Sequence, residues 1–363
     1  MRGADITQET LFTTAKLDDF VPDDHPLRAI RQLTDQALGR MSGLFSSLYA
    51  DTGRHSIAPE KLLRAQLLQL FYSLRSERML MEQLRYNLLF RWFVGIAIDE
   101  AVWDHSVFSK NRDRLNDESV AAEFLQEIVR LATQRGLMSD EHFSVDGTLL
   151  QAWASQKSFR PKDGPPDHGT GGGPRNAAPD FKGQKRRNDT HASTSDPDSR
   201  LFCKGNTGAQ LSYQGHVLME HRSGLVRAAC VSRATGYGER ESALRLLKQL
   251  RGRRRRTLAA DKAYDTADFV AACREAGVTA HVAQNNNGRR SAIDGRTTRH
   301  AGYALSLKTR AWIETHFGWL KTAAGMRQVR QRGLARVDAL FQFAMAASNL
   351  VRLPKLLAAG ADP

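Results

Sequence analysis

The spacing of apolar residues changes near residue 138, and this change constrains the fold more than any other feature of the chain. Before it, apolar residues recur at helical spacing, as in Leu62, Leu63, Leu67, Leu70 and Leu74. After it, short apolar runs typical of strands alternate with helical segments. We therefore predict an all-helical N-terminal domain over residues 1–137, an α/β domain over residues 138–354 and a tail over residues 355–363.

Residues at the expected helix ends locate the N-terminal helices. Pro59 suits a first helical turn, and Ser76 and Asp104 are candidate N-caps. The helix after Asp104 carries three basic residues that we expect to contact DNA: Lys110, Arg112 and Arg114. Short helices joined by tight turns are compatible with DNA binding of helix-turn-helix type, and equally with a plain helical bundle.

The α/β part is expected to contain five strands, over residues 143–147, 211–220, 225–233, 257–260 and 278–283. Helices are expected over residues 239–250, 266–277, 307–321 and 337–353, the last ending before Pro354. Three antiparallel strands followed by αβ units make a mixed sheet with helices on its faces. This order matches the ribonuclease-H-like fold.

Residues 155–200 interrupt this pattern. They are rich in Gly, Pro, Asn, Asp, Lys and Arg and contain few apolar residues, so we expect a flexible basic insertion. It is either a simple tether or a mobile arm that folds onto DNA.

The charge of the chain points to a polyanionic partner. The net charge is +14 and the pI about 10.0, and each Lys or Arg placed on a phosphate releases condensed counterions. Charge alone does not separate nucleic acid from an anionic membrane surface. No apolar run approaches the roughly 20 residues that span a bilayer, and no secretory signal is visible, so we expect a cytoplasmic protein without a membrane partner.

The cysteines are scattered and lack CxxC spacing: Cys203, Cys230 and Cys273. We therefore expect neither a disulfide framework nor a zinc site.

Two acidic residues follow expected strands. Asp146 ends the first strand and Asp261 ends the fourth. In a ribonuclease-H-like sheet these strands are parallel neighbours, about 4.8 Å apart, so both carboxylates would lie side by side on one edge. Two anions this close repel each other unless a cation lies between them. Magnesium takes such oxygen ligands and keeps positions open for phosphate and water.

A third acid, Glu314, falls within the expected helix over residues 307–321. Arg310 precedes it by four residues and Lys321 follows it by seven, spacings that place all three on one helical face. Glu314 could therefore close a metal site while the cations hold DNA phosphates. Two metal ions in such a site can activate the nucleophile and stabilise the leaving oxygen.

Each acid also has an ordinary structural interpretation. An Asp after a strand is commonly a turn or cap residue, and a Glu between Arg and Lys is commonly part of a solvated ion-pair face. The ordered combination of the three carries the prediction. Beside the second acid, Lys262 is expected to contact DNA, Tyr264 to contact DNA or pack internally, and Asp265 to cap the following helix.

Three segments around these acids resemble the motifs of the DDE transposases of bacterial insertion sequences, closest to the branch typified by insertion sequence five. They are Phe143-Ser-Val-Asp-Gly-Thr148, Ala259-Ala-Asp-Lys-Ala-Tyr-Asp265 and the Arg-x3-Glu-x6-Lys spacing of residues 310–321. The N-terminal helical part and the closing helix, with Ser348-Asn-Leu-Val-Arg352, also resemble that family, so the likeness covers nearly the whole chain.

The resemblance implies a DNA transposase that performs metal-dependent strand cleavage and strand transfer. It implies Asp146, Asp261 and Glu314 as ligands of Mg²⁺, with Mn²⁺ as a substitute and two ions in the site, and Arg310 and Lys321 as supporting cations. The implied partners are the terminal repeats of the element and its target DNA. A homodimer or higher oligomer would join the two ends, and the protein would act at the bacterial nucleoid.

One position departs from the family pattern. Related transposases have a Tyr three residues before the motif arginine, where this chain has Leu307; Tyr303 or Tyr264 could take its place. Two alternatives to a transposase stay open: a ribonuclease-H-like nuclease or resolvase, and a non-catalytic DNA-binding protein derived from a transposase.

Overall fold

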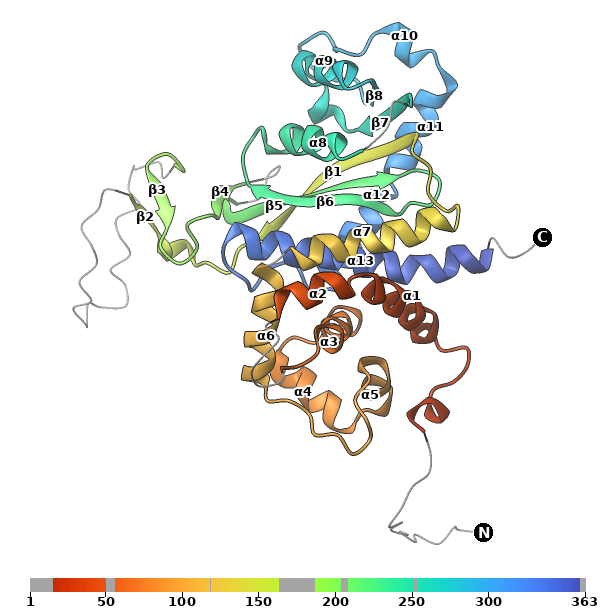
Figure 1. Ribbon diagram of the computed structural model, residues 1–363. Helices are drawn as coiled ribbons and strands as arrows, with labels where there is room; N and C mark the ends of the chain where they lie inside the picture. The colour runs from red at the N-terminus through yellow and green to blue at the C-terminus, as the bar shows by residue number, and fades with distance from the viewer. Residues whose placement is uncertain are drawn as a thin grey trace, which may run out of the picture.

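The computed structural model describes residues 16–49, 56–117, 119–162, 187–203, 208–250 and 254–359. Its N-terminal part is helical, as predicted (Figure 1). The elements are η1 (Leu17–Phe20), α1 (Pro26–Arg40), α2 (Ser42–Leu48), α3 (Pro59–Phe71), α4 (Glu77–Tyr86), α5 (Leu88–Val94), α6 (His105–Asp117) and α7 (Val120–Gln134).

The predicted capping residues begin these helices. Pro59 occupies the first turn of α3, the Ser76 hydroxyl accepts a bond from the Met79 amide (3.1 Å), and Asp104 accepts one from the Ser106 amide (2.8 Å). The helix that Ser76 begins ends at Tyr86, and Asn87 then caps α5 by accepting a bond from an amide of its first turn.

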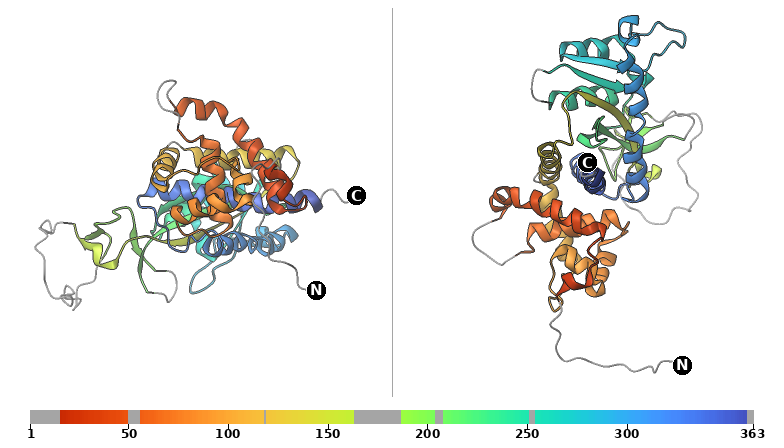
Figure 2. Two further views of the ribbon diagram at one scale, coloured as in Figure 1. Left: turned by 90° about the horizontal axis from the view of Figure 1, so that it is seen from below. Right: turned by 90° about the vertical axis from the view of Figure 1, so that its right-hand side faces the viewer.

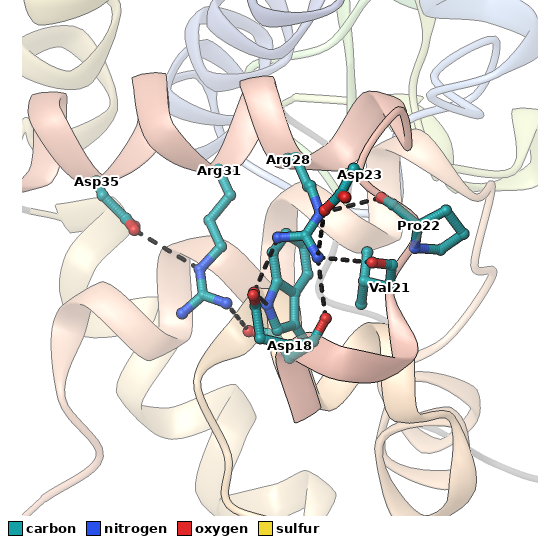
Figure 3. Close-up of polar contacts among 8 residues, drawn as sticks. Asp18, Val21, Pro22, Asp23, Arg28, Arg31 and Asp35 are labelled. Atoms are coloured by element: carbon teal, nitrogen blue, oxygen red, sulfur yellow. Dashed lines mark hydrogen bonds and ion pairs between the residues drawn. The ribbon is translucent and has the colours of Figure 1, made fainter. Parts of the chain in front are cut away.

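The start of the described chain is held by a polar cluster around Arg28 and Asp18 (Figure 3). Arg28 donates to the Asp18 carboxylate (2.9 Å) and to the Val21 carbonyl (2.6 Å), and the Trp92 indole donates to Asp18 (2.8 Å). The bonds from Trp92 and then from Arg28 lower the pKa of Asp18. The cluster therefore ties η1 to α1 and to α5.

The second part contains the predicted mixed sheet. Its strands are β1 (His142–Gln151), β4 (Arg200–Phe202), β5 (Gln210–Glu220), β6 (Val226–Arg233), β7 (Arg256–Ala260) and β8 (Val278–Val282). β5 pairs with β1 and β6 antiparallel, whereas β7 is parallel to both β1 and β8. The five expected strands and the ribonuclease-H-like order are thus confirmed; β4 is an additional short strand on the edge of β5.

The described part of the insertion over residues 155–200 forms regular structure, where a flexible segment was expected. It contains η2 (Gln156–Ser158) and the hairpin β2 (Phe159–Pro161) with β3 (His191–Ser193). Buried Asp196 accepts a bond from the Tyr213 hydroxyl of β5 (2.5 Å), which fixes the end of the insertion to the sheet. The glycine-rich stretch over residues 169–174 lies outside the described residues.

Helices cover the sheet on two faces (Figures 1 and 2). The elements not yet named are α8 (Gly238–Lys248), η3 (Lys262–Tyr264), α9 (Ala267–Glu275), α10 (Gly295–Thr298), α11 (Ala301–Arg310), α12 (Ile313–Thr322) and α13 (Leu334–Ala359). One apolar core lies under α8 and α9. A larger one runs without interruption from the N-terminal helices through α7 and α13 to the other sheet face.

α13 lies between the N-terminal helices and the sheet (Figure 1), and it runs through Pro354 rather than ending before it. A proline inside a helix removes one backbone hydrogen bond and costs about 3 kcal/mol. Leu350 and Leu353 are fully buried just before it, and their packing offsets that cost. The N-terminal helices and the sheet therefore share one core through α13.

His316 fastens α12 to this core. Its Nε2–H donates to the Gly224 carbonyl of the β5–β6 turn (2.7 Å), and its Nδ1 accepts from the Ser348 hydroxyl of α13 (2.8 Å). Burial lowers the pKa of His316 to about 4, so the ring is neutral near pH 7.

The stability of the fold should therefore fall as the pH drops from about 6.5 toward 4. In that range His316 is protonated in the unfolded chain but stays neutral in the folded protein. The full loss from this one group is roughly 3 kcal/mol. Urea unfolding of His316→Gln should show a lower stability at pH 8, by about 1–3 kcal/mol, and a shallower decline below pH 6.5. An unchanged decline would contradict this role; His221, whose pKa burial also lowers to about 4, leaves a residual slope in the variant.

Candidate active site

The pairing of β1 with β7 brings the first two acids together. The parallel register matches His142 to Thr257 and Ser144 to Ala259. Continuing it by two residues sets Asp146 beside Asp261. Residues matched in this way on parallel strands point to the same side of the sheet. Because neighbouring strands lie about 4.8 Å apart, the two carboxylates would be close to each other.

Asp146 lies inside β1, not at its end as predicted. β7 is the strand that ends here: Asp261 follows it and accepts a bond from the Ala263 amide (2.9 Å), which starts η3. The Asp146 side chain is 12% exposed, and its Oδ1 accepts from the Gly147 amide (2.7 Å). The ending of β7, rather than that of β1, opens the edge where both acids lie.

This edge of β1 is free of strand partners over a short stretch. β7 pairs with it as far as Ser144, and pairing resumes at Gln151, which bonds to the carbonyl of Arg327 (3.1 Å) and the amide of Val329 (2.8 Å). Within the described part of the chain, no strand pairs with residues 145–150 on this side. Asp146 lies in that stretch, which the surrounding structure buries although no strand pairs with it there.

Arg310, the last residue of α11, reaches Asp146. Its Nη1 donates to the Asp146 Oδ2 at 3.0 Å, and the two side chains are 22% and 12% exposed. A half-buried guanidinium thus offsets the charge of the first acid and reduces its repulsion from Asp261. The motif arginine was expected beside Glu314 on one helical face; the structure places it on the first acid.

The helix predicted over residues 307–321 is two helices. At the junction Trp312 bonds back to Thr309 (3.0 Å) and Glu314 bonds back to Ala311 (3.1 Å), each over three residues. This tighter turn rotates Glu314 relative to Arg310, so the expected common face is lost. Glu314 lies exposed in the first turn of α12.

The three predicted ligands are therefore not gathered at one point. Across the ranges that the structure describes, no three His, Cys, Asp or Glu side chains group closely enough to hold a metal ion. Arg310 contacts Asp146, the extended register matches Asp146 with Asp261, and Lys262 is exposed next to Asp261. Lys321 is half-buried, two turns along α12 from Glu314.

Glu239 is a further acid at this edge that sequence reasoning missed. It lies in the first turn of α8, and its Oε1 is 3.0 Å from the position a Cβ on Gly147 would occupy. Tyr264 lies beside it, fully buried against Phe269. Burial, and then the charges of Glu239, Asp146 and Asp261, raise the pKa of Tyr264 well above its usual value.

Tyr303 and Tyr264, the two candidates to replace the missing motif tyrosine, both make contacts elsewhere in the fold. The Tyr303 hydroxyl donates to the Val282 carbonyl of β8 (2.8 Å), and Tyr264 packs internally. Neither Tyr303 nor Tyr264 therefore takes the place of the tyrosine that is expected where this chain has Leu307.

Asp265 does not cap α9 as predicted; the Thr266 hydroxyl does, accepting from the Phe269 amide (3.4 Å). Buried Asp265 instead accepts bonds from the amides of Asn285 (2.7 Å) and Ala292 (2.9 Å). Burial alone would raise the pKa of Asp265, but these bonds lower it overall.

The basic residues of α6 differ in their surroundings. Arg112 forms ion pairs with Glu77 of α4 and with Asp113, and its side chain is 19% exposed, so it joins two helices. Lys110 and Arg114 are exposed, and Arg114 lies 5.4 Å from the centre of the Tyr49 ring.

Comparison with known families agrees with this geometry. The family described as Transposase DDE domain matches residues 139–350, and a family described as Transposase domain matches residues 15–114. The chain belongs to the Transposase DDE domain family.

The solved structures that resemble this chain are distant in sequence. A piggyBac transposase synaptic complex with hairpin DNA is 10% identical with a TM-score of 0.43, over 93% of this chain and 76% of that one. A Mos1 mariner paired end complex with Mn is 11% identical with a TM-score of 0.25, over 90% and 87% of the two chains. Among the described residues, none of the helices combines the length and the hydrophobicity that a membrane span requires.

The close contact of Gly147 with Glu239 can be tested by a double-mutant cycle. Alanine normally stabilises a strand by about 0.5–1 kcal/mol relative to glycine, but here its methyl group would press on Glu239. Gly147→Ala should therefore be more favourable in a Glu239→Ala background, by at least about 1 kcal/mol in urea unfolding. The control Gly43→Ala, which has open space around it, should show no coupling. Equal effects of Gly147→Ala in both backgrounds would refute the contact.

Proposed function

We propose that this protein is a DNA transposase that cleaves strands at the ends of an insertion sequence and joins them to target DNA, using divalent metal ions. The observation that carries the proposal is the parallel register of β1 and β7, which when extended past the end of β7 matches Asp146 with Asp261, together with Arg310 at 3.0 Å from Asp146. The family match over residues 139–350 supports it.

The donor set fits magnesium or manganese. Mg²⁺ is commonly bound in proteins through one or two carboxylates, with water and substrate phosphates as the other ligands. Asp146 and Asp261 would supply those carboxylates from neighbouring strands. When bound, a pair of such ions activates the attacking oxygen and stabilises the leaving oxygen of an in-line displacement.

The surrounding cations would act on the DNA itself. Arg310 places a guanidinium next to the two aspartates, where a phosphate group gains charge during displacement. Lys262 is exposed beside Asp261 and would contact the DNA backbone. Lys321 would support the same strand from α12.

Glu314 would complete the ligand set when DNA binds. It is exposed one turn beyond Arg310, and the tight turn that begins at Ala311 separates the two residues. Repacking of that turn as a continuous α-helix would bring Glu314 back to the face of Arg310. Binding of DNA phosphates by Arg310 supplies an energetic reason for the change.

The N-terminal helices would hold the element ends through exposed basic side chains, including Lys110 and Arg114. Since two ends must be joined, a homodimer or larger assembly would form on DNA. The motif spacing favours the branch typified by insertion sequence five, whose members act on DNA at the bacterial nucleoid.

The test is strand transfer of pre-cleaved element-end DNA with a free 3′-hydroxyl, in Mg²⁺ or Mn²⁺. Asp146→Asn, Asp261→Asn and Glu314→Gln should each lower the rate by at least about 100-fold, while their thermal stability stays close to that of the natural chain. The control Asp268→Asn, an exposed acid on α9, should keep full activity. Cutting without joining would indicate a nuclease instead, and unchanged activity of Asp146→Asn would overturn the catalytic assignment.

A further inference from the structure

A groove lies at the far end of β1, beyond the acids. Its volume is about 480 Å³. Six of the side chains that line it are Gln151, Trp153, Gln156, Gln210, Gln328 and Arg332. It forms where the segment over residues 327–329 pairs with the end of β1, the same strand that carries Asp146.

The groove presents an aromatic ring to solvent. Trp153 is 46% exposed, although large aromatic side chains normally bury most of their surface. An exposed ring in a polar groove suits stacking of a nucleic-acid base, which is largely independent of base identity.

Four amide side chains line the groove beside Trp153. Hydrogen bonds to backbone carbonyls hold two of them in place, from Gln156 to Ala209 (2.9 Å) and from Gln328 to Ala152 (3.2 Å). An amide side chain offers both donors and an acceptor, so it can pair with the edges of bases. This part of the wall is therefore polar, and two of its amides are held in place.

One end of the groove is basic. Arg332 lines it, and Arg327 and Arg330 are exposed on the same segment. The lining contains no carboxylate within the described ranges. Cations on one side and amides on the other suit a ligand that carries both phosphate and bases.

The distance from the acids fits a position on the same DNA. Gln151 follows Asp146 by five residues on one strand, which corresponds to roughly 16 Å, the length of about five base pairs. We propose that this groove binds DNA flanking the scissile phosphate, with an unpaired base stacked on Trp153 and its phosphate held by Arg332. This inference rests on the proposed transposase function.

The test measures binding of fluorescent DNA to the full-length protein in EDTA, which separates binding from catalysis. Two duplexes are compared: a forked one with unpaired bases about five positions from the cleavage site, and a fully paired one. Trp153→Ala should weaken binding of the forked DNA roughly 10-fold or more, Trp153→Phe should retain most of it, and Arg332→Ala should weaken it with a reduced salt dependence. The fully paired duplex should change less than about 3-fold with Trp153→Ala.

Tyr86→Ala serves as the matched control, because Tyr86 is a 61% exposed aromatic residue on α4, far along the chain from the groove. Equal binding of forked DNA by the natural chain, Trp153→Ala and Tyr86→Ala would overturn the proposal even if strand transfer occurs. Conversely, selective loss with Trp153→Ala supports the groove even if strand transfer fails. Photocrosslinking from 5-iododeoxyuridine at the unpaired position should label Trp153; labelling elsewhere alone would also overturn it.

Discussion

The short parallel pairing between β1 and β7 is the constraint on which the rest of the site depends. β7 pairs with β1 as far as Ser144 and then ends, while β1 continues to Gln151. Because side chains alternate between the faces of a sheet, a slip of one residue would turn Asp146 and Asp261 to opposite sides. The register and the early end of β7 together create a pair of carboxylates at an open edge.

The helical core explains how this edge is held in place. α13 is buried against α7, the N-terminal helices and one face of the sheet, and His316 ties α12 to α13 and to the β5–β6 turn. α11, which carries Arg310, and α12, which carries Glu314, are joined by only a tight turn. The position of Arg310 on Asp146 thus depends on packing far from the acids, and the turn at Ala311 is where the site can change.

Much of this arrangement could be predicted from local patterns. The apolar runs located β5, β6, β7 and β8, and side-chain caps such as Ser76 located helix starts, because these signals act over a few residues. The features that were missed depend on tertiary contacts. β4 and the β2–β3 hairpin have three residues per strand, too few for an apolar pattern. α13 continues through Pro354 because packing outweighs local preference.

In the candidate site, too, some features follow from local sequence patterns and others from tertiary contacts. Asp146, Asp261 and Arg310 were identified from spacing; Arg310 contacts Asp146, and the register of β1 and β7 leads toward Asp261. The tight turn before Glu314 and the approach of Glu239 under Gly147 arise from contacts between distant segments, which no local pattern records. Glycine at position 147 was the one available signal, since a larger side chain would meet Glu239.

The position of a bound metal ion is the most direct test of whether Asp146 and Asp261 form the catalytic site. Anomalous scattering from crystals of the protein with element-end DNA and Mn²⁺ would locate it. We expect a peak with carboxylate oxygens of both Asp146 and Asp261 at about 2.1 Å. Manganese that touches neither aspartate, or only one of them with Glu239 in the other's place, would contradict it.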